Sequence, residues 1–192
     1  MNEKEVKLIE PTETLREAFG ELIQGFHVAG EIEQPPGSCW KDEDDFATFM
    51  RRIRDYARGE NLPDGWVPDS AYWLVRGKRI LGVCDLRHRL TEALRDFGGH
   101  IAYSVRPSER SKGYGTLMLK LMLGKARQLG IDRVLVTCDA GNIASQRVIL
   151  KNGGVLESES YSAQAGRATQ RYWIDLAEPG RQTAPRSENR SP

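Results

Sequence analysis

The chain has 192 residues, which is enough for one domain with a substantial core and too few for two ordinary domains. With 39% apolar and 29% charged residues, the composition indicates a folded soluble domain and excludes a disordered chain. The formal net charge of +1 argues against general affinity for nucleic acid or membrane surfaces, and no apolar run approaches the ~20 residues that span a bilayer.

Charges and cysteines are unevenly spread along the chain. Residues 31–70 carry ten acids and five bases, whereas residues 106–151 carry nine bases and three acids. This division suits a polyanionic cofactor and a cationic acceptor, although solvated helix faces also explain the acidic half. The three cysteines lie far apart and near no pair of histidines, so we expect reduced thiols, no metal site and a cytoplasmic location (Cys39, Cys84 and Cys138).

Hydrophobic periodicity and turn residues predict the order of elements. Thr14 and Glu17 have the spacing of a capping box, and the acids at 42–45 suit the first turn of a second helix. Residues 133–138 form the near-continuous apolar run of a strand covered on both faces. In chain order we expect a strand at 6–9, helices at 14–26 and 42–56, strands at 71–75, 80–86 and 100–105, a helix at 111–129, a strand at 133–138, a helix at 142–151, and strands at 155–161 and 169–176.

This order predicts an α/β (α+β) fold: one mixed, mostly antiparallel sheet with helices on both faces. Residues 1–176 are expected to form the single domain. Residues 177–192 are rich in Pro, Ser, Arg and Gln without a pattern, so we predict a disordered tail.

One stretch carries the clearest functional signal. An apolar strand at 100–105 leads through Pro107 into a basic glycine loop that opens a long apolar helix. Such a loop presents several free backbone N–H groups to a phosphate at the positive end of the helix dipole. A Walker loop is excluded because Gly115 is followed by Thr116 and Leu117, and a dinucleotide fingerprint lacks its third glycine.

The loop Arg110-Ser111-Lys112-Gly113-Tyr114-Gly115 resembles the acetyl-coenzyme A signature R/Q-x-x-G-x-G/A of the GNAT superfamily of N-acetyltransferases. The segments Asn142–Ser145 and 151–153 resemble the second cofactor segment of that family, and the order of elements over about residues 5–176 matches its fold.

The resemblance implies acetyl-CoA as cofactor and assigns residues to it. The N–H groups from Ser111 to Thr116 would surround the pyrophosphate, with Arg110 and Lys112 adding charge. The backbone of Tyr103, Ser104 and Val105 would pair with the pantetheine arm, and Asn142 and Ser145 would contact the arm from the other side. Asn142 is equally an ordinary helix N-cap.

The residues that move protons are less clearly marked. Many family members place a tyrosine proton donor where this chain has Ile149, and an aromatic residue where it has Gly154. Ser145 is the nearest substitute that matches a motif position, and Tyr114 is another. For the base we consider His100, whose intrinsic pKa suits the task, and Asp85 at the end of the preceding strand. Two residues of the next loop remain further candidates: His88 and Glu92.

The predicted function is transfer of an acetyl group from acetyl-CoA to a primary amine of a small molecule by direct attack in a ternary complex. The acceptor would bind near the acids at 42–45, with a wall of Trp40, Trp66 and Tyr72, whereas Trp73 and Trp173 are expected in the core. Two alternatives are acetylation of a protein or peptide N-terminus and a non-catalytic coenzyme A-binding module. A homodimer is compatible with this fold.

Overall fold

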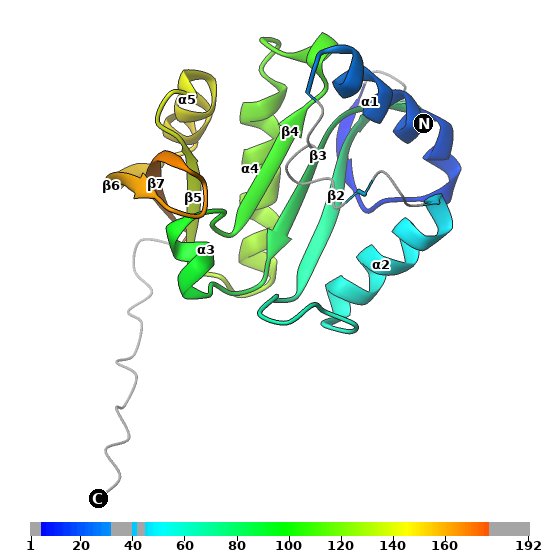
Figure 1. Ribbon diagram of the computed structural model, residues 1–192. Coiled ribbons are helices and arrows are strands. Elements are labelled where there is room, and N and C mark those ends of the chain that lie inside the picture. Colours follow the sequence, from blue (N-terminus) through cyan, green and yellow to red (C-terminus); the bar gives the residue numbers. More distant parts are fainter. Residues whose placement is uncertain (1–4, 32–39, 42–44, 177–192) are drawn as a thin grey trace, which may run out of the picture.

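The computed structural model describes residues 5–31, 40–41 and 45–176. The predicted tail at 177–192, the acids at 42–44, the break at 34–37 and Cys39 lie outside the described residues. The strands form two antiparallel sheets, of order β1-β2-β3-β4 and β5-β7-β6 (Figure 1). Their bounds are Val6–Ile9 (β1), Asp69–Arg76 (β2), Arg79–Arg87 (β3), Ile101–Val105 (β4), Arg133–Asp139 (β5), Val155–Ser162 (β6) and Arg167–Asp175 (β7).

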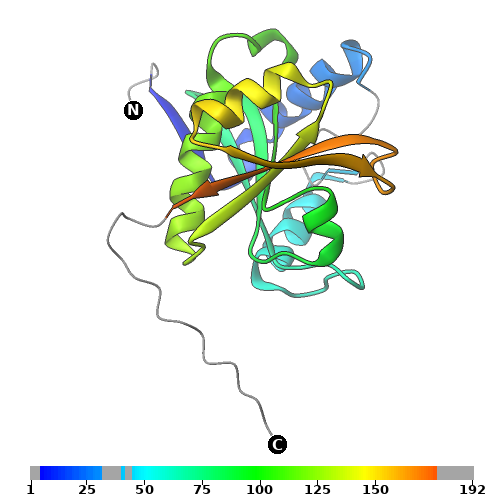
Figure 2. The ribbon, with the colours of Figure 1, turned by 90° about the vertical axis from the view of Figure 1, so that its left-hand side faces the viewer.

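Helices cover both faces of the first sheet. Figure 1 shows α1 and α2 on one side of it and α4 on the other, and Figure 2 views the molecule from the side where the β6–β7 hairpin lies in front. The expected fold class is therefore confirmed. The helices are α1 (Arg16–Val28), α2 (Phe46–Arg58), α3 (Glu92–Asp96), α4 (Tyr114–Gln128) and α5 (Ile143–Lys151), with short 3-10 turns at Glu13–Leu15 and Pro107–Glu109.

Two apolar cores follow from the alternation of side chains along the strands. Ala71 and Trp73 of β2 point toward α1 and α2, where the Trp73 ring stacks on the Phe19 ring with centroids 5.0 Å apart. Tyr72 and Leu74 point the other way, into the core shared with α4 and the second sheet. The two faces of the first sheet therefore have distinct chemical surroundings.

Both N-terminal helices begin differently from the sequence prediction. The Thr14 capping box is wrong: the Thr12 hydroxyl accepts from the Thr14 N–H and caps the 3-10 turn that precedes α1. Helix α2 begins at Phe46 with Asp45 as its cap, since the Asp45 carboxylate accepts from the Thr48 N–H at 2.8 Å. The acid at 45 therefore lies before the first turn rather than inside it.

The two sheets meet at His100 instead of forming the single expected sheet. The His100 N–H donates to the Leu135 carbonyl at 2.8 Å, and the Leu135 N–H donates to the His100 ring nitrogen Nδ1 at 2.9 Å. Gly99 has φ +61°, and a Cβ there would lie 2.5 Å from the Leu135 oxygen. The His100 ring nitrogen thus accepts the Leu135 N–H where a backbone carbonyl would accept it in a regular sheet. The backbone hydrogen bonding between β4 and β5 therefore does not continue past this point.

Candidate active site

The loop between β4 and α4 presents a row of free backbone donors. Ser111 and Gly113 have positive φ, 61° and 85°, and Gly113 is followed directly by α4, which no side chain caps. Within the described part of the chain, the N–H groups of residues 111–116 donate to no carbonyl or side chain. Free donors at the positive end of a helix dipole favour an anion such as a phosphate.

The two cations of this loop are held by carboxylates. Arg110 donates to both oxygens of Glu31 at 2.6 and 2.8 Å and, through Nε, to the Val105 carbonyl at 3.2 Å. Lys112 donates to the Ser108 carbonyl and to Glu109, whose other oxygen accepts from Arg79. The groups of this loop that are free to bind an anion are therefore its backbone N–H groups, because Arg110 and Lys112 are already paired with carboxylates.

The remaining loop residues anchor α4. The Arg76 guanidinium donates to the Tyr114 hydroxyl at 2.9 Å, which ties the start of α4 to β2. A Cβ on Gly115 would approach Val148 of α5 to 3.2 Å, so the glycine permits close packing of the two helices. The Thr116 carbonyl accepts from the Asn152 amide at 3.2 Å. Tyr114 is therefore engaged in positioning the loop.

Tyr103, Ser104 and Val105 end β4, which is an edge strand of the first sheet. Its inner side pairs with β3, and Ser104 lies opposite Val83 on the face that carries α1 and α2. Tyr103 points to the opposite face, toward α4. An edge strand can pair with an extended chain that contains amide groups.

The Tyr103 side chain meets Ser145 of α5, a contact that is not predicted from the sequence, where only the Tyr103 backbone has an expected role. The two hydroxyl oxygens lie 2.9 Å apart, and burial raises the pKa of Tyr103 to about 12. Cys138 of β5 lies beside them, and burial raises its pKa to about 11 despite a hydrogen bond with Ser145. Asn142 caps α5, because its side-chain oxygen accepts from the Ser145 N–H at 3.0 Å. Tertiary structure therefore brings Tyr103, Cys138 and Ser145 into one cluster of neutral donors.

The two departures from the family pattern are linked in space. Ile149 is fully buried, and its Cγ2 lies 2.4 Å from where a Cβ on Gly154 would be. The space that an aromatic residue would need at 154 is therefore filled by Ile149.

His100 is positioned as a clamp between the sheets rather than as a base. Because Nδ1 accepts from the Leu135 N–H, the neutral ring carries its proton on Nε2 and has no lone pair left for a substrate. Burial and the positive charges of Arg95 and Arg87 lower the pKa of His100 to about 4. The expectation that His100 is the general base is thus contradicted by its bonding.

Asp85 is buried on the face of the sheet that carries α1 and α2. Its Oδ1 accepts from the Ala102 N–H at 3.2 Å and lies 3.5 Å from the Arg87 guanidinium. Burial raises its pKa, which Arg87 and the Ala102 hydrogen bond oppose. Two other candidates lie apart from it: the His88 ring is hydrogen-bonded to Ser70 at 2.8 Å, and Glu92 is exposed at the start of α3.

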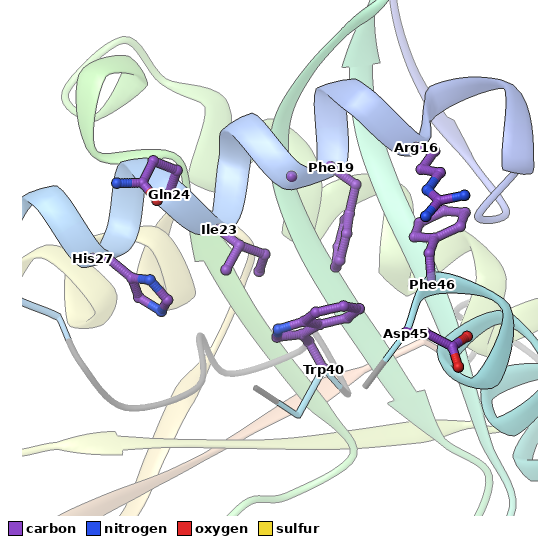
Figure 3. Close-up of a pocket in the computed structure, with 9 residues that line it drawn as sticks. Arg16, Phe19, Ile23, Gln24, His27, Trp40, Asp45 and Phe46 are labelled. Carbon is purple, nitrogen blue, oxygen red and sulfur yellow. The ribbon is translucent and has the colours of Figure 1, made fainter. Parts of the chain in front are cut away.

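A hollow of about 570 Å³ lies between α1 and α2. Figure 3 shows Phe19 and Ile23 pointing into it from α1, with Trp40 and Asp45 facing them. Trp40 and Asp45 therefore occupy the expected region. Trp66 and Tyr72 do not line this hollow, because Trp66 is exposed beside Tyr56 and Tyr72 is buried on the α4 side.

The core assignments are partly confirmed. Trp73 is buried at 1% exposure, as predicted. Trp173 is only partly buried, and the Arg133 guanidinium lies over its ring at 4.5 Å from the centroid. Across the described residues, no group of three or more His, Cys, Asp or Glu side chains could hold a metal ion, and no helix is long and apolar enough to cross a membrane.

The family comparison agrees with this geometry. Residues 11–155 match the model of the acetyltransferase (GNAT) domain. The chain belongs to the GNAT acetyltransferases. It is therefore an enzyme of acetyl transfer, acetyl-CoA is the donor that this family uses, and the alternative of a non-catalytic binding module is set aside. No curated protein matches the chain.

Solved structures share the fold of this GNAT enzyme at low sequence identity. YncA, a putative acetyltransferase from Salmonella typhimurium solved with acetyl-CoA, is 16% identical, with a TM-score of 0.59 over 93% of this chain and 98% of its own. An acetyltransferase from the same organism, which modifies the N-terminal serine of ribosomal protein L7/L12, is 18% identical, with a TM-score of 0.62 over 90% and 95%. Mycobacterium smegmatis RimJ, in complex with CoA-disulfide, is 17% identical, with a TM-score of 0.64 over 91% and 83%.

Proposed function

We propose that this enzyme transfers the acetyl group of acetyl-CoA to a primary amine by direct attack in a ternary complex. The observation that carries the proposal is the row of free N–H groups at 111–116, at the head of α4 and next to the open edge of β4. The pyrophosphate binds this row. The amides of the pantetheine arm pair with the backbone of residues 103–105, which directs the thioester toward Tyr103 and Ser145.

Ser145 and Tyr103 stabilise the departing sulfur by hydrogen bonding rather than by giving up a proton. A free thiol has a pKa of about 8.5. Proton transfer to its thiolate from Tyr103, whose pKa is about 12, would therefore cost roughly 5 kcal/mol. A hydrogen bond from the Ser145 hydroxyl, itself supported by Tyr103 at 2.9 Å, carries no such cost. The thiolate then takes its proton from the attacking nitrogen, which loses it as the amide forms.

The acceptor amine reaches the thioester from the face that carries α1 and α2. That face holds Asp85, a buried carboxylate able to receive a proton, and the hollow lined by Trp40 and Phe19. A small molecule fits a hollow of about 570 Å³. A peptide N-terminus is the second candidate, since several proteins of similar fold have names that describe acetylation of ribosomal proteins.

Thiol release from acetyl-CoA tests both candidates. The purified enzyme is incubated with a panel of small primary amines and, in parallel, with short peptides that have free N-termini. The same peptides with blocked N-termini are the control. We expect turnover only with acceptors that carry a free amine and none with the blocked peptides. A higher kcat/KM for the unblocked peptides than for the small amines would favour the second candidate. Release of coenzyme A at the same rate with and without any amine would contradict the proposal.

A further inference from the structure

Two buried aspartates lie on neighbouring strands and share one face of the first sheet. Asp85 of β3 lies opposite Ala71 of β2, and Ala71 belongs to the core formed with α1 and α2. Asp69 precedes Ala71 by two residues, so its side chain points to the same face. Their exposed fractions are only 6% for Asp69 and 3% for Asp85. The two carboxyl groups are therefore diagonal neighbours within the protein interior.

The two carboxyl groups differ in their hydrogen bonds. Asp85 receives the Ala102 N–H at 3.2 Å and the nearby charge of Arg87. Asp69 Oδ1, in contrast, is buried without a hydrogen-bond partner among the described residues. A buried acceptor without a partner is costly, and proteins normally meet it with a proton, a water molecule or a ligand. Asp69 therefore holds a buried oxygen whose hydrogen-bonding capacity the described part of the fold does not satisfy.

The surroundings make the two ionisations depend on each other. Burial raises the pKa of both carboxyl groups, and the negative charge of Asp85 raises that of Asp69 further, whereas Arg87 lowers both. Among the described residues, no charged group other than Arg87 and the pair itself shifts either pKa, and burial keeps the Cys84 thiol protonated. The second negative charge is therefore the difficult one to form, and the pair loses its protons in two separated steps.

Asp85 lies on the strand beside β4, on the opposite face of the sheet from the Tyr103 side chain. Asp85 is opposite Ala102 of β4, and Ala102 directly precedes Tyr103, whose hydroxyl meets Ser145. One strand, β4 itself, separates Asp85 from the open β4 edge along which the pantetheine arm is proposed to lie, and two strands, β3 and β4, separate Asp69 from it. Both carboxyl groups lie on the face from which the acceptor is proposed to approach.

We propose that Asp69 and Asp85 act together as the proton acceptor of the reaction: the doubly ionised pair binds the ammonium group of the acceptor and takes one of its protons. This assignment rests on the function proposed above. The pair gains one proton, and the freed lone pair of the nitrogen forms the C–N bond to the acetyl carbon. The C–S bond breaks with its electrons on sulfur, which takes a second proton from the nitrogen. The pair later returns its proton to water.

Two negative charges side by side make a stronger base than one buried carboxylate. A base works best when its pKa lies near the pH of the reaction. Repulsion between two like charges raises the pKa of the second ionisation of a carboxyl pair toward that pH. Asp69 supplies this coupling and also the free oxygen. Of this pair only Asp85 is among the base candidates that the sequence offers, because no motif marks Asp69 and its partner lies 16 positions away in the chain.

The experiment has a direct part that needs no substrate. Carboxyl carbon NMR of the full chain labelled with [13C]aspartate is recorded against pH for the wild type, Asp69→Asn and Asp85→Asn. Asp64→Asn, at an exposed loop position, is the control. We expect two coupled steps in the wild type, and in each pair variant one remaining step about one pH unit or more below the upper wild-type step. The control keeps both steps. If Asp85→Asn does not fold, Asp69→Asn alone decides.

The second part measures kcat/KM for the amine against pH. We expect Asp69→Asn to move the acid limb to lower pH by about one unit and to lower the plateau, with KM for acetyl-CoA unchanged. An upper step that stays in place in a pair variant, or an unshifted acid limb in Asp69→Asn, would overturn the assignment while leaving acetyl transfer intact. Coupled titration in a wild type that acetylates no amine would instead overturn the proposed function, and the catalytic role of the pair with it.

Discussion

The Tyr103 hydroxyl lies 2.9 Å from the Ser145 hydroxyl, on a strand and a helix that are 42 residues apart in the chain. This contact places a phenol beside Ser145 of α5, the helix on which Ile149 stands where many family members have a tyrosine. It brings the phenol from β4 instead of α5, so in the mechanism proposed above Ser145 meets the sulfur and Tyr103 supports it.

Removing the Ser145 hydroxyl should lower kcat without weakening acetyl-CoA binding. Loss of one hydrogen bond to a charged sulfur is worth about 1.5–3 kcal/mol, so Ser145→Ala should reduce kcat by roughly 10- to 100-fold. Tyr103→Phe, which keeps the ring packed, should have a smaller effect and add little in the double variant, because it acts through Ser145. Steady-state thiol release measures both. Additive losses from the two changes would show that the hydroxyls act separately.

The N-terminus of α4 can be tested with a matched pair of glycines. Gly113 has φ +85° and Gly124 lies within the same helix, and a Cβ at either would meet nothing within 4 Å. Gly113→Ala strains the turn by about 1 kcal/mol and displaces the N–H row, so we expect weaker coenzyme A binding. Gly124→Ala should leave binding unchanged and stabilise the helix by up to about 1 kcal/mol. Calorimetric titration with coenzyme A gives the comparison; equal affinities would argue against phosphate binding at this loop.

Ile149 and Gly154 should behave as a coupled pair in stability. A Cβ on Gly154 would lie 2.4 Å from Ile149 Cγ2 and 3.0 Å from the Ile149 carbonyl oxygen. Gly154→Ala should therefore lower the free energy of unfolding by about 1–3 kcal/mol through overpacking. Ile149→Ala removes Cγ2, so the double variant should lose less than the sum of the single losses. Urea denaturation measures the cycle, and strict additivity would contradict the steric link.

His100 should make the fold sensitive to mild acid. Its pKa is about 4 in the folded protein and about 6.5 in an unfolded chain, so the unfolded state binds more protons between these values. The contribution of His100 to stability is therefore complete above pH 6.5 and is lost as the pH falls toward 4. Carboxyl groups titrate in the same pH range in the wild type and in His100→Asn. The informative quantity is therefore the difference between the free energies of unfolding of these two proteins. That difference should shrink from pH 7 to pH 5 in denaturant titrations. A constant difference would contradict the hydrogen bond of the neutral His100 ring with the Leu135 N–H.

Local patterns determined most of the secondary structure and the cofactor loop. The loop at 110–116 could be read directly because its glycines, its preceding strand and its following helix are contiguous in the chain. The capping prediction at Thr14 failed because the chain begins a 3-10 turn before this position, and the cap of that turn is Thr12, which accepts from the Thr14 N–H. Single hydrogen bonds decide such helix boundaries, and the sequence pattern is equally compatible with a cap at Thr12 and a cap at Thr14.

Tertiary structure alone decided which polar side chains meet at the candidate active site. The sequence shows His100 as a residue with a suitable pKa, but only the approach of β5 places the Leu135 N–H on Nδ1 and turns the ring into a clamp. Tyr103 joins Ser145, and Asp69 joins Asp85, through contacts across the sheet that no local pattern records. Backbone conformation follows from neighbours in the chain, whereas the pKa of a side chain follows from its neighbours in space. The sequence thus determined which donor this protein holds, and the packing of its two sheets decided which groups are left to move the protons.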